Sequence, residues 1–356
     1  MKFIRNISAA ELSVCENADN FLQSAMWGKF KSQFGWQAFS FVIEYNGGEQ
    51  YPLLVLSRRI TRGIVMAYVP WPQLPKDYSA KDRSTALAEL AVKLKPCITP
   101  GTAFIRFEPS WYTACTEYPE NLTTCGFKRA AATVQPPDTV HVNLDVTCEE
   151  LLANMKSKWR YNISLAAKKG VQVKTGGVED IETFYSLLKE TALRDGIAVH
   201  NIGYYKTLFG VCDEQGRAGD GSTLRLYIAC HEGDTLAANV VLFRGKIATY
   251  LYGASSNVKR NLMAPYALQW KAMQDAKEAG CQYYDLFGIP PDDNPNHPMA
   301  GLYRFKTGFG GQIIHRPGTW DYIYKPIVYR LFNIAEAMRK KLMSLRKKRS
   351  AAARGN

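Results

Sequence analysis

The sequence of 356 residues lacks several features that would place it in a special class of protein. No apolar run approaches the ~18 residues that a membrane-spanning helix needs. The N-terminal MKFIRNISAAELSVCENADN has no sustained apolar segment of the signal-peptide kind. The 8 cysteines include no CxxC pair, and the 5 histidines form no HxxxH or HExxH motif. These absences argue against a zinc site or a disulfide framework and favour buried, reduced thiols in a cytoplasmic protein.

Acidic residues are scarce at the C-terminus. The formal net charge is +13, and the stretch from Lys325 to Asn356 contains ten basic residues against one acid, Glu336. In the same stretch apolar residues recur at spacings of three and four: Ile327, Val328, Leu331, Ile334, Met338, Leu342 and Leu345. This pattern indicates a basic amphipathic helix that suits an anionic membrane surface or nucleic acid, and it does not choose between the two. The plain alternative is a frayed, solubilising tail.

With 46% hydrophobic and 22% charged residues, the chain has the composition of a globular protein, and its length favours two domains. A block repeats along it at an offset near 185 residues. Strands predicted over 42–59 and 63–70, a helix over 84–95 and a strand over 103–109 return as strands over 227–245 and 247–255, a helix over 265–280 and a strand over 282–290. A helix precedes each block, over 11–25 and over 178–196.

Each block is thus predicted to be an antiparallel meander followed by a strand–helix–strand crossover, which makes its last two strands parallel neighbours. Helix, meander and crossover follow one another in the order of acyltransferases of the GNAT type. We therefore expect an α/β protein with mixed sheets in two tandem GNAT-like domains, over 1–146 and 147–316. Residues 317–356 would form a C-terminal segment with the basic tail. A ligand would bind in the cleft between the two domains.

Neither block carries the glycine-containing turn with which GNAT enzymes usually hold the pyrophosphate of coenzyme A. The corresponding stretches, PWPQLPKDYSAKDR and SSNVKRNLMAPYAL, contain no glycine. We therefore expect that the chain does not use acetyl-CoA and needs no cofactor.

Local motifs in chain order resemble the Fem/MurM aminoacyltransferases, which build the cross-bridges of peptidoglycan. The motifs are FLQSAMWGKFKSQFGW, MKSKWRYNISLAAKKGVQV, LYGASS…APYALQWKAMQDAKEAGCQYYDLFGI and LYRFKTGFGG, between about residues 20 and 315. No long coiled-coil insertion interrupts the second block, so the chain is most similar to the shorter, FemX-like members. The resemblance implies two partners: aminoacyl-tRNA as the donor, and UDP-MurNAc-pentapeptide or lipid II as the acceptor. We also expect a monomer.

The resemblance also implies the reaction. The side-chain amine of the stem peptide attacks the aminoacyl ester, an amide forms and the ribose hydroxyl leaves. Such an enzyme must hold a diphosphate, orient a neutral amine and stabilise an oxyanion, without a metal or a covalent nucleophile.

The resemblance places several residues at the acceptor. Lys31 matches the lysine that binds the diphosphate, and Tyr204 and Tyr252 match tyrosines that line the site, although a surface lysine and core tyrosines are the plain alternatives. His200 stands where the family has an arginine. It either binds phosphate weakly, or Arg194 or Lys206 compensates, or the acceptor differs. Glu108 matches an acidic residue near the first-domain cleft, where it would pair with a cation or position the amine.

For acyl transfer the resemblance points to LYRFKTGFGG. Phe305 and Lys306 match the family's pair at the site of transfer, Lys306 as a positive charge for the oxyanion or the tRNA 3′ phosphate and Phe305 as a dry wall or stacking platform. The following glycines would let the backbone approach a bulky substrate. The plain alternative is a strand that ends in a turn with one snorkelling lysine.

A lysine-rich segment is the candidate for phosphate-backbone contacts of the tRNA, through Lys156, Lys158 and Arg160. Its plain alternative is a solvated helix face.

Two other functions compete with the aminoacyltransferase. One is a GNAT-type N-acyltransferase that uses acyl-CoA or another activated acyl donor on a different amine. The other is a non-catalytic protein that binds RNA or an anionic membrane through its basic tail.

Overall fold

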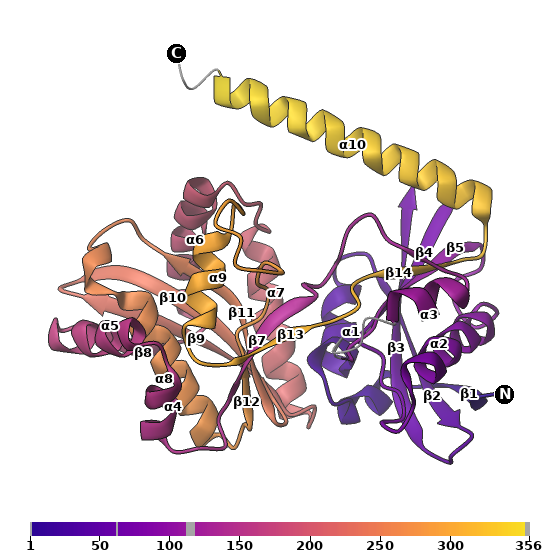
Figure 1. The fold of residues 1–356 in the computed structure, drawn as a ribbon, viewed down its shortest axis with the longest axis horizontal. Helices are drawn as coiled ribbons and strands as arrows, with labels where there is room; N and C mark the ends of the chain where they lie inside the picture. The colour runs from indigo at the N-terminus through magenta and orange to yellow at the C-terminus, as the bar shows by residue number, and fades with distance from the viewer. Residues whose placement is uncertain (1, 62, 112–117, 353–356) are drawn as a thin grey trace.

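A computed structural model describes residues 2–61, 63–111 and 118–352. Within them the chain forms two mixed sheets, seen side by side in Figure 1, each with helices against it. The first sheet has the strand order β1 (Ile4–Ala10), β2 (Gln37–Tyr45), β3 (Gln50–Thr61), β4 (Ile64–Pro70), β5 (Thr102–Glu108), β14 (Trp320–Ile323), β6 (Phe127–Arg129). The second has the order β13 (Gln312–His315), β7 (Asp138–Asn143), β12 (Tyr283–Asp285), β11 (Ile247–Ser255), β10 (Asp234–Arg244), β9 (Ser222–His231), β8 (Gln172–Gly176).

The predicted repeat is present in both sheets. The strands β1 to β4 and β8 to β11 pair antiparallel, whereas β4 with β5 and β11 with β12 are parallel. The crossover helices are α2 (Ala80–Leu94) and α8 (Ala264–Glu278). Helix α2 begins four residues before the predicted start, because Ser79 and Asp82 form a capping box there. The strand predicted over 282–290 is shorter, since only Tyr283–Asp285 pair with β11.

The helix predicted over 11–25 is replaced by two 3-10 turns, η1 (Leu12–Asn17) and η2 (Phe21–Gln23), followed by α1 (Ala25–Ser32). In the second half the prediction is confirmed, because η3 (Val178–Asp180) leads into α6 (Ile181–Asp195), which ends at a left-handed Gly196. The remaining helices are α3 (Tyr118–Thr124), α4 (Cys148–Asn154), α5 (Ser157–Lys168), α7 (Ile202–Arg217), α9 (Ala300–Thr307) and α10 (Pro326–Ala352), with a 3-10 turn η4 (Arg260–Leu262).

The two halves exchange one strand each. Strand β7, which follows the first block in the chain, lies between β12 and β13 of the second sheet, and β14, which follows the second block, lies between β5 and β6 of the first. Sheet membership therefore differs from the expected bounds of 1–146, 147–316 and 317–356. A strand can pair with a strand that is far away in the sequence, and hydrophobic patterning does not reveal which sheet a short strand joins.

A shared core joins the halves. Phe30 of α1 packs against Tyr204 of α7 with ring centroids 4.8 Å apart. Beside this contact, the buried pair of Arg244 and Asp220 binds the N-terminal turns. The Arg244 guanidinium donates to the carbonyls of Glu16 and Ala18, and the Asp220 carboxylate accepts from the backbone N–H of Met26 at 3.2 Å. Helix α1 is thereby held against the second half, with its exposed end near α7.

The cysteines of the described residues are free thiols, while Cys115 lies outside those residues. Cys15, Cys212 and Cys281 are buried as expected, whereas Cys97 is exposed and Cys125, Cys148 and Cys230 are half-buried.

Candidate active site

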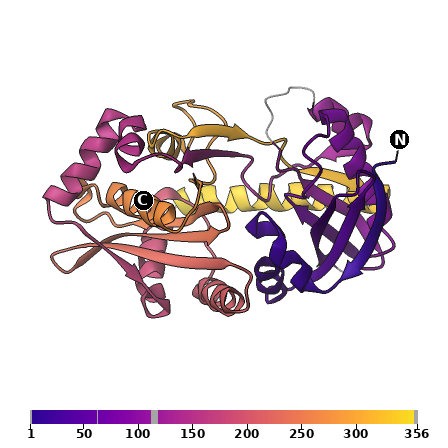
Figure 2. The ribbon, with the colours of Figure 1, turned by 90° about the horizontal axis from the view of Figure 1, so that it is seen from below.

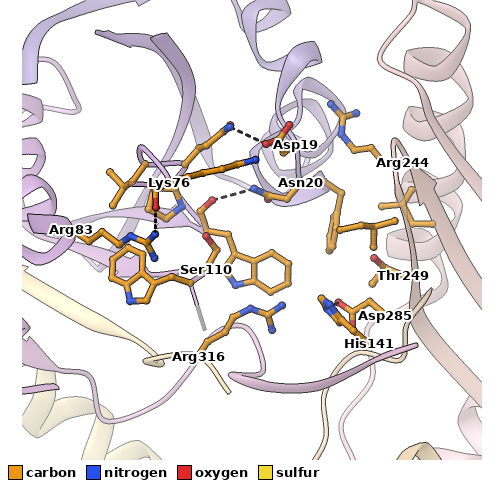
Figure 3. A pocket seen from close by; sticks show the side chains of 18 residues that line it. Asp19, Asn20, Lys76, Arg83, Ser110, His141, Arg244, Thr249, Asp285 and Arg316 are labelled. Atoms are coloured by element: carbon orange, nitrogen blue, oxygen red, sulfur yellow. Dashed lines mark hydrogen bonds and ion pairs between the residues drawn. The ribbon is translucent and has the colours of Figure 1, made fainter. Parts of the chain in front are cut away.

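A cavity of about 470 Å³ lies between the halves, where β4 and β5 end (Figure 3). The carboxyl ends of parallel strands in open sheets are a usual place for ligands. From the first half it is lined by Asp19, Asn20, Phe21, Trp71, Pro72, Gln73, Leu74, Lys76, Arg83, Ser110 and Trp111, and from the second by His141, Leu242, Arg244, Ile247, Thr249, Asp285 and Arg316. We call it the interdomain cavity; its position confirms that a cleft between the domains exists.

One wall of this cavity is built around Asp285, which is buried at the end of β12. Its carboxylate accepts hydrogen bonds from the Thr139 hydroxyl and the Phe287 backbone, and it lies 3.4 Å from His141 Nε2. Burial alone would raise the pKa of Asp285, but His141, the charge of Arg316 and the Thr139 hydroxyl lower it to about 2. Asp285 is therefore ionised at neutral pH.

The facing wall combines cations with tryptophans. The Arg316 guanidinium lies 4.2 Å from the ring centre of Trp71, and that of Arg83 lies 5.9 Å from Trp111. Such stacking keeps a guanidinium planar to an aromatic face while its edge can still donate hydrogen bonds. The cavity is thus suited to a ligand that carries negative charge beside a flat or apolar group.

Four of the sequence-predicted residues gather at a second place, outside this lining, which we call the Lys31 cluster: Lys31, His200, Tyr204 and Tyr252. The His200 ring stacks on Tyr204 at 3.8 Å, and Lys31 Nζ lies 5.8 Å from the centre of the same ring. The hydroxyls of Tyr204 and Tyr252 lie near enough to influence each other's pKa. Three elements, α1, the start of α7 and β11, therefore bring these side chains together from both halves.

Burial decides the charges in the cluster. It lowers the pKa of Lys31 to about 8, with a further contribution from the Arg58 charge, so Lys31 is mostly protonated at pH 7. Burial and the Lys31 charge lower the pKa of His200 below its usual 6.5, and burial raises the pKa of both tyrosines. At neutral pH the cluster therefore presents one ammonium beside a neutral imidazole and two neutral phenols.

The sequence did not single out Arg58, at the exposed end of β3. Its guanidinium lies 5.6 Å from the centre of the Trp36 ring, and Lys31 Nζ lies 6.0 Å from the same ring. The candidates for compensation point elsewhere. Arg194 binds Asp195 and the Ser255 carbonyl, and Lys206 pairs with Glu182. The only signal for Arg58 in the sequence was the pair of arginines in VLSRR, and such a pair can occur at the exposed end of any strand.

Lys306 lies on a helix, α9, and not on a strand that ends in a turn, so that plain alternative is wrong. Its side chain is buried, and Nζ donates to the carbonyls of Phe287 at 3.2 Å and Gly288 at 2.9 Å. Burial lowers the pKa of Lys306 to about 7, although the Asp285 charge opposes the shift. Lys306 therefore lies against the segment that follows Asp285 in the chain, on the side of its carbonyls. About half of the Lys306 side chains are protonated at neutral pH.

Phe305 points to another side of α9. Its ring packs edge-on against Tyr266 and Phe309, each at 5.2 Å, in the core of the second half. Its carbonyl accepts a hydrogen bond of 2.9 Å from Trp159 Nε1. Phe305 thus connects α9 to α5 and α8, and it does not face the same surroundings as Lys306.

The glycines after Lys306 do allow close approach, but the group that comes close is the protein itself. A Cβ at Gly308 would overlap the Trp159 ring, one at Gly310 the Asn154 carbonyl, and one at Gly311 the His141 carbonyl. These positions let α9 and β13 pack directly on α4, α5 and β7.

Replacing Gly308 with alanine is expected to lower the free energy of unfolding by about 1–3 kcal/mol, the usual cost of overpacking, because Trp159 is held by its bond to Phe305. Gly301→Ala, on the same helix with no atom within 4 Å of the added methyl, is the matched control and should be neutral or stabilising. Urea denaturation of both variants measures the difference. Equal midpoints would show that Trp159 moves aside without cost.

Glu108 is buried in the first half, and its carboxylate is already occupied. One oxygen accepts from the backbone N–H groups of Val134 and Gln135 at 2.7 and 2.9 Å and from the Thr319 hydroxyl at 2.6 Å. The other accepts from the Tyr68 hydroxyl. Val134 and Gln135 lead into β7, and Thr319 leads into β14, so Glu108 ties both exchanged strands to β5. Its role in positioning an amine or pairing with a cation stays a prediction.

Lys156, Lys158 and Arg160 are exposed at the start of α5. The Arg160 guanidinium donates to the carbonyls of Ala153 and Met155, at the end of α4, whereas the two lysines extend from the helix start. The backbone of Lys156 also donates to the Gly308 carbonyl at 3.0 Å. This basic surface is therefore adjacent to the end of α9, which carries Lys306.

The Lys31 cluster and Lys306 lie on a continuous run of aromatic contacts. Lys31 Nζ is 5.3 Å from the Trp27 ring, Trp27 packs on Phe21 at 5.4 Å, and Phe21 packs on Phe287 at 6.3 Å. Phe287 is the residue whose carbonyl binds Lys306, and Phe21 lines the interdomain cavity. One aromatic layer thus separates a cationic cluster on one side from a buried lysine on the other.

The turn before α8 does not provide the phosphate-binding turn of a coenzyme A site. Lys259 and Met263 have positive φ there, and the N–H groups of Leu262 and Met263 donate to carbonyls within the turn. Among residues 2–61, 63–111 and 118–352, no three His, Cys, Asp or Glu side chains are grouped as metal ligands would be.

Two sheets of like strand order, each with a meander and a parallel crossover around a shared cleft, define a tandem GNAT-like fold. The chain belongs to the FemAB family, whose model matches residues 13–215 and 227–337. The predicted class, a transferase of the Fem family with a tandem GNAT-like fold, is confirmed.

Relatives match along most of the chain. The lipid II:glycine glycyltransferase of Staphylococcus aureus (strain COL) is 24% identical over 381 residues, which cover 88% of this chain and 90% of the relative. The protein of the same description from strain USA300 is 23% identical over the same shares. A crystal structure of FemX superposes with a TM-score of 0.78 at 20% identity, covering 92% of this chain and 99% of that one, which shows a common fold.

Proposed function

We propose that this protein transfers an amino acid from aminoacyl-tRNA to the stem-peptide side-chain amine of a peptidoglycan precursor, lipid II or UDP-MurNAc-pentapeptide. Membership in the FemAB family and the glycyltransferase relatives support this function. The observation that carries it is the Lys31 cluster, because side chains far apart in the sequence meet in the arrangement that a diphosphate-bearing acceptor requires.

On the acceptor side, both precursors contain a diphosphate. Lys31 supplies an ammonium to it, and Arg58, over the same Trp36 ring, supplies a second cation. The neutral phenols of Tyr204 and Tyr252 can donate to phosphate oxygens, as a cationic site lined by hydroxyls does. His200 is mostly neutral, so it orients Tyr204 by stacking and Arg58 replaces the charge of the family arginine.

Transfer takes place where the stem peptide reaches the Phe21–Phe287 layer and the interdomain cavity. A neutral amine attacks the ester carbonyl, the oxygen of the tetrahedral intermediate becomes negative, and the ribose oxygen leaves with a proton. The Lys306 ammonium lies behind the Phe287 and Gly288 carbonyls, where a charge acts over several ångströms because the interior has a low dielectric constant. Phe305 keeps α9 packed so that this ammonium stays in place.

On the donor side, the exposed Lys156 and Lys158 contact tRNA phosphates, while Arg160 mainly ties the start of α5 to α4. Their helix is joined to α9 through the bond from Trp159 to Phe305. A tRNA held on this surface therefore has its 3′ end directed toward α9.

Incubation with charged tRNA and either acceptor tests the proposal. We expect the muramyl peptide to gain the mass of one amino-acid residue, with no gain when the tRNA is uncharged or when acetyl-CoA replaces it. If no aminoacyl-tRNA extends either the soluble or the lipid-linked acceptor, the proposed function is wrong. If acetyl-CoA acylates an amine in the same assay, the protein is an acyl-CoA-dependent transferase instead.

A further inference from the structure

The C-terminal helix α10 packs on the first half through residues near its start. Figure 1 shows it along one side of the molecule, from the end of β14 toward the second half, and Figure 2 shows the same helix from below. Tyr329 and Phe332 pack on Phe104 of β5 at 5.1 and 5.2 Å. The Tyr329 hydroxyl donates to Asp321, which also binds Arg106 at 2.7 and 2.8 Å. The start of α10 is thus fixed to the first half by buried aromatic contacts and by the hydrogen bond of Tyr329 to the Asp321–Arg106 ion pair.

The apolar stripe predicted for this helix faces solvent. At 100° per residue Ile327, Leu331, Ile334, Met338, Leu342 and Leu345 fall within an arc of about 80°. Val328 lies beyond one edge of this arc, toward Phe332, and packs against the core; Tyr329 lies opposite. Five members are between 45% and 79% exposed: Ile327, Leu331, Ile334, Met338 and Leu342. The described side chain of Val328 is half-buried. From Ile327 to Leu342 the exposed stripe runs for about 22 Å at about 1.5 Å per residue, which makes it a contiguous apolar surface and not a set of scattered apolar side chains.

Basic residues border the stripe. Arg330 and Lys341 are exposed along one edge, and Arg339, paired with Glu336, lies along the other. The sequence continues this pattern with Arg346 and Lys348, and the stretch from Lys325 onward has ten basic residues and one acid. An apolar stripe with cationic borders matches the boundary between lipid headgroups and acyl chains, where the stripe enters and the cations remain at the headgroups.

RNA binding would use the basic residues but leave the apolar stripe exposed to water, and a second copy of the helix would bring like charges together along both borders. No helix of the described residues is long and apolar enough to cross a membrane. We propose that α10 lies flat in the interface of an anionic bilayer and thereby places the active site at lipid-linked acceptor. The part that concerns the acceptor rests on the proposed function.

Co-sedimentation of the full-length protein with vesicles tests the binding. With phosphatidylglycerol and phosphatidylethanolamine we expect strong partition that weakens as salt rises, and with phosphatidylcholine alone we expect little. Met338→Glu should lower partition at least about tenfold, because a charge then enters the apolar stripe. Ala337→Glu is the matched control, since it makes the same charge change at the adjacent exposed residue but off the stripe, and it should lose much less.

Equal losses in the two variants, or no partition of the wild type into phosphatidylglycerol vesicles, would overturn the proposal. So would tRNA binding that both variants weaken alike without vesicle binding, which would make α10 an RNA contact. A wild-type dimer that Met338→Glu converts to a monomer would show that the stripe pairs two copies.

Activity separates this inference from the proposed function. Met338→Glu should keep full transfer to soluble UDP-MurNAc-pentapeptide but lose most transfer to lipid II in vesicles. If no acceptor is extended while partition still depends on Met338, the proposed function fails and the bilayer site stands. If lipid II in vesicles is extended equally by Met338→Glu and Ala337→Glu, α10 does not deliver the enzyme to its acceptor.

Discussion

Lys31→Met is expected to lower kcat/KM for the acceptor by about 30-fold or more, mainly through a higher KM. Removing one partner of a desolvated charge pair costs about 2–5 kcal/mol, because the remaining charge stays without compensation. Here the diphosphate would lose its buried ammonium while Arg58 remains at the rim of the site. Steady-state kinetics with varied UDP-MurNAc-pentapeptide at saturating aminoacyl-tRNA measure the change.

Lys29→Met is the matched control, because Lys29 is on the same helix but exposed, and its KM should be that of the wild type. The pH dependence adds a second readout. Lys31 binds the acceptor when protonated, and its pKa is about 8. The wild-type KM should therefore be flat below pH 7 and rise by up to about tenfold per pH unit well above pH 8. A Lys31→Met enzyme that keeps both the wild-type KM and this rise would remove Lys31 from the acceptor site.

Arg58 gives a smaller effect of the same kind. It is exposed, so screening by water reduces its contribution relative to Lys31. The neighbouring Arg59 points to the other face of β3, because side chains alternate along a strand. The sequence VLSRR does not show which of the two adjacent arginines lies beside the Lys31 cluster.

The repeated block was predictable because its signals are local. Alternating β-branched strands, a Gly turn and a helix with Gly280 just after its end each follow from residues within one element, and the same order in two places makes the repeat visible. The exchanged strands were not predictable. Strands β7 and β14 are six and four residues long, and their partners are chosen by buried contacts such as those of Glu108.

In the candidate site, too, some features were predictable from the sequence and others were not. The resemblance brought Lys31, His200, Tyr204 and Tyr252 to attention, and the folded chain places them together. The charge of each depends on burial, which the sequence does not contain. Burial and the nearby Lys31 charge lower the pKa of His200. The buried hydrogen bonds of Lys306 form only when α9 packs on the loop that follows β12.

Lys306→Met is expected to lower kcat for transfer by about 100-fold or more and to leave the acceptor KM near its wild-type value. Loss of one preorganised group that stabilises an oxyanion costs about 10²–10³ in kcat, and the Lys31 cluster lies beyond the Phe21–Phe287 layer from Lys306. Arg304→Met, on the exposed side of the same helix, should have no effect. Single-turnover rates with preformed complexes separate this loss from slower binding.

The pH profile decides whether the charge of Lys306 or only its packing is used. Its pKa is about 7, so the ammonium is present below pH 7 and is lost above it. If the charge stabilises the transition state, the ratio of wild-type to Lys306→Met kcat should be greatest below pH 7 and should fall as the pH rises toward 9. A neutral amine that acts as a base would give the opposite slope, and a purely structural role would give no slope.

The stability of the folded protein should change with pH in the opposite direction to the kcat ratio. A lysine whose folded pKa lies below its unfolded value makes the fold less stable at low pH, so the wild type should gain stability relative to Lys306→Met between pH 7 and 10. A flat kcat ratio combined with this stability gain would reduce Lys306 to a support for the Phe287 and Gly288 carbonyls.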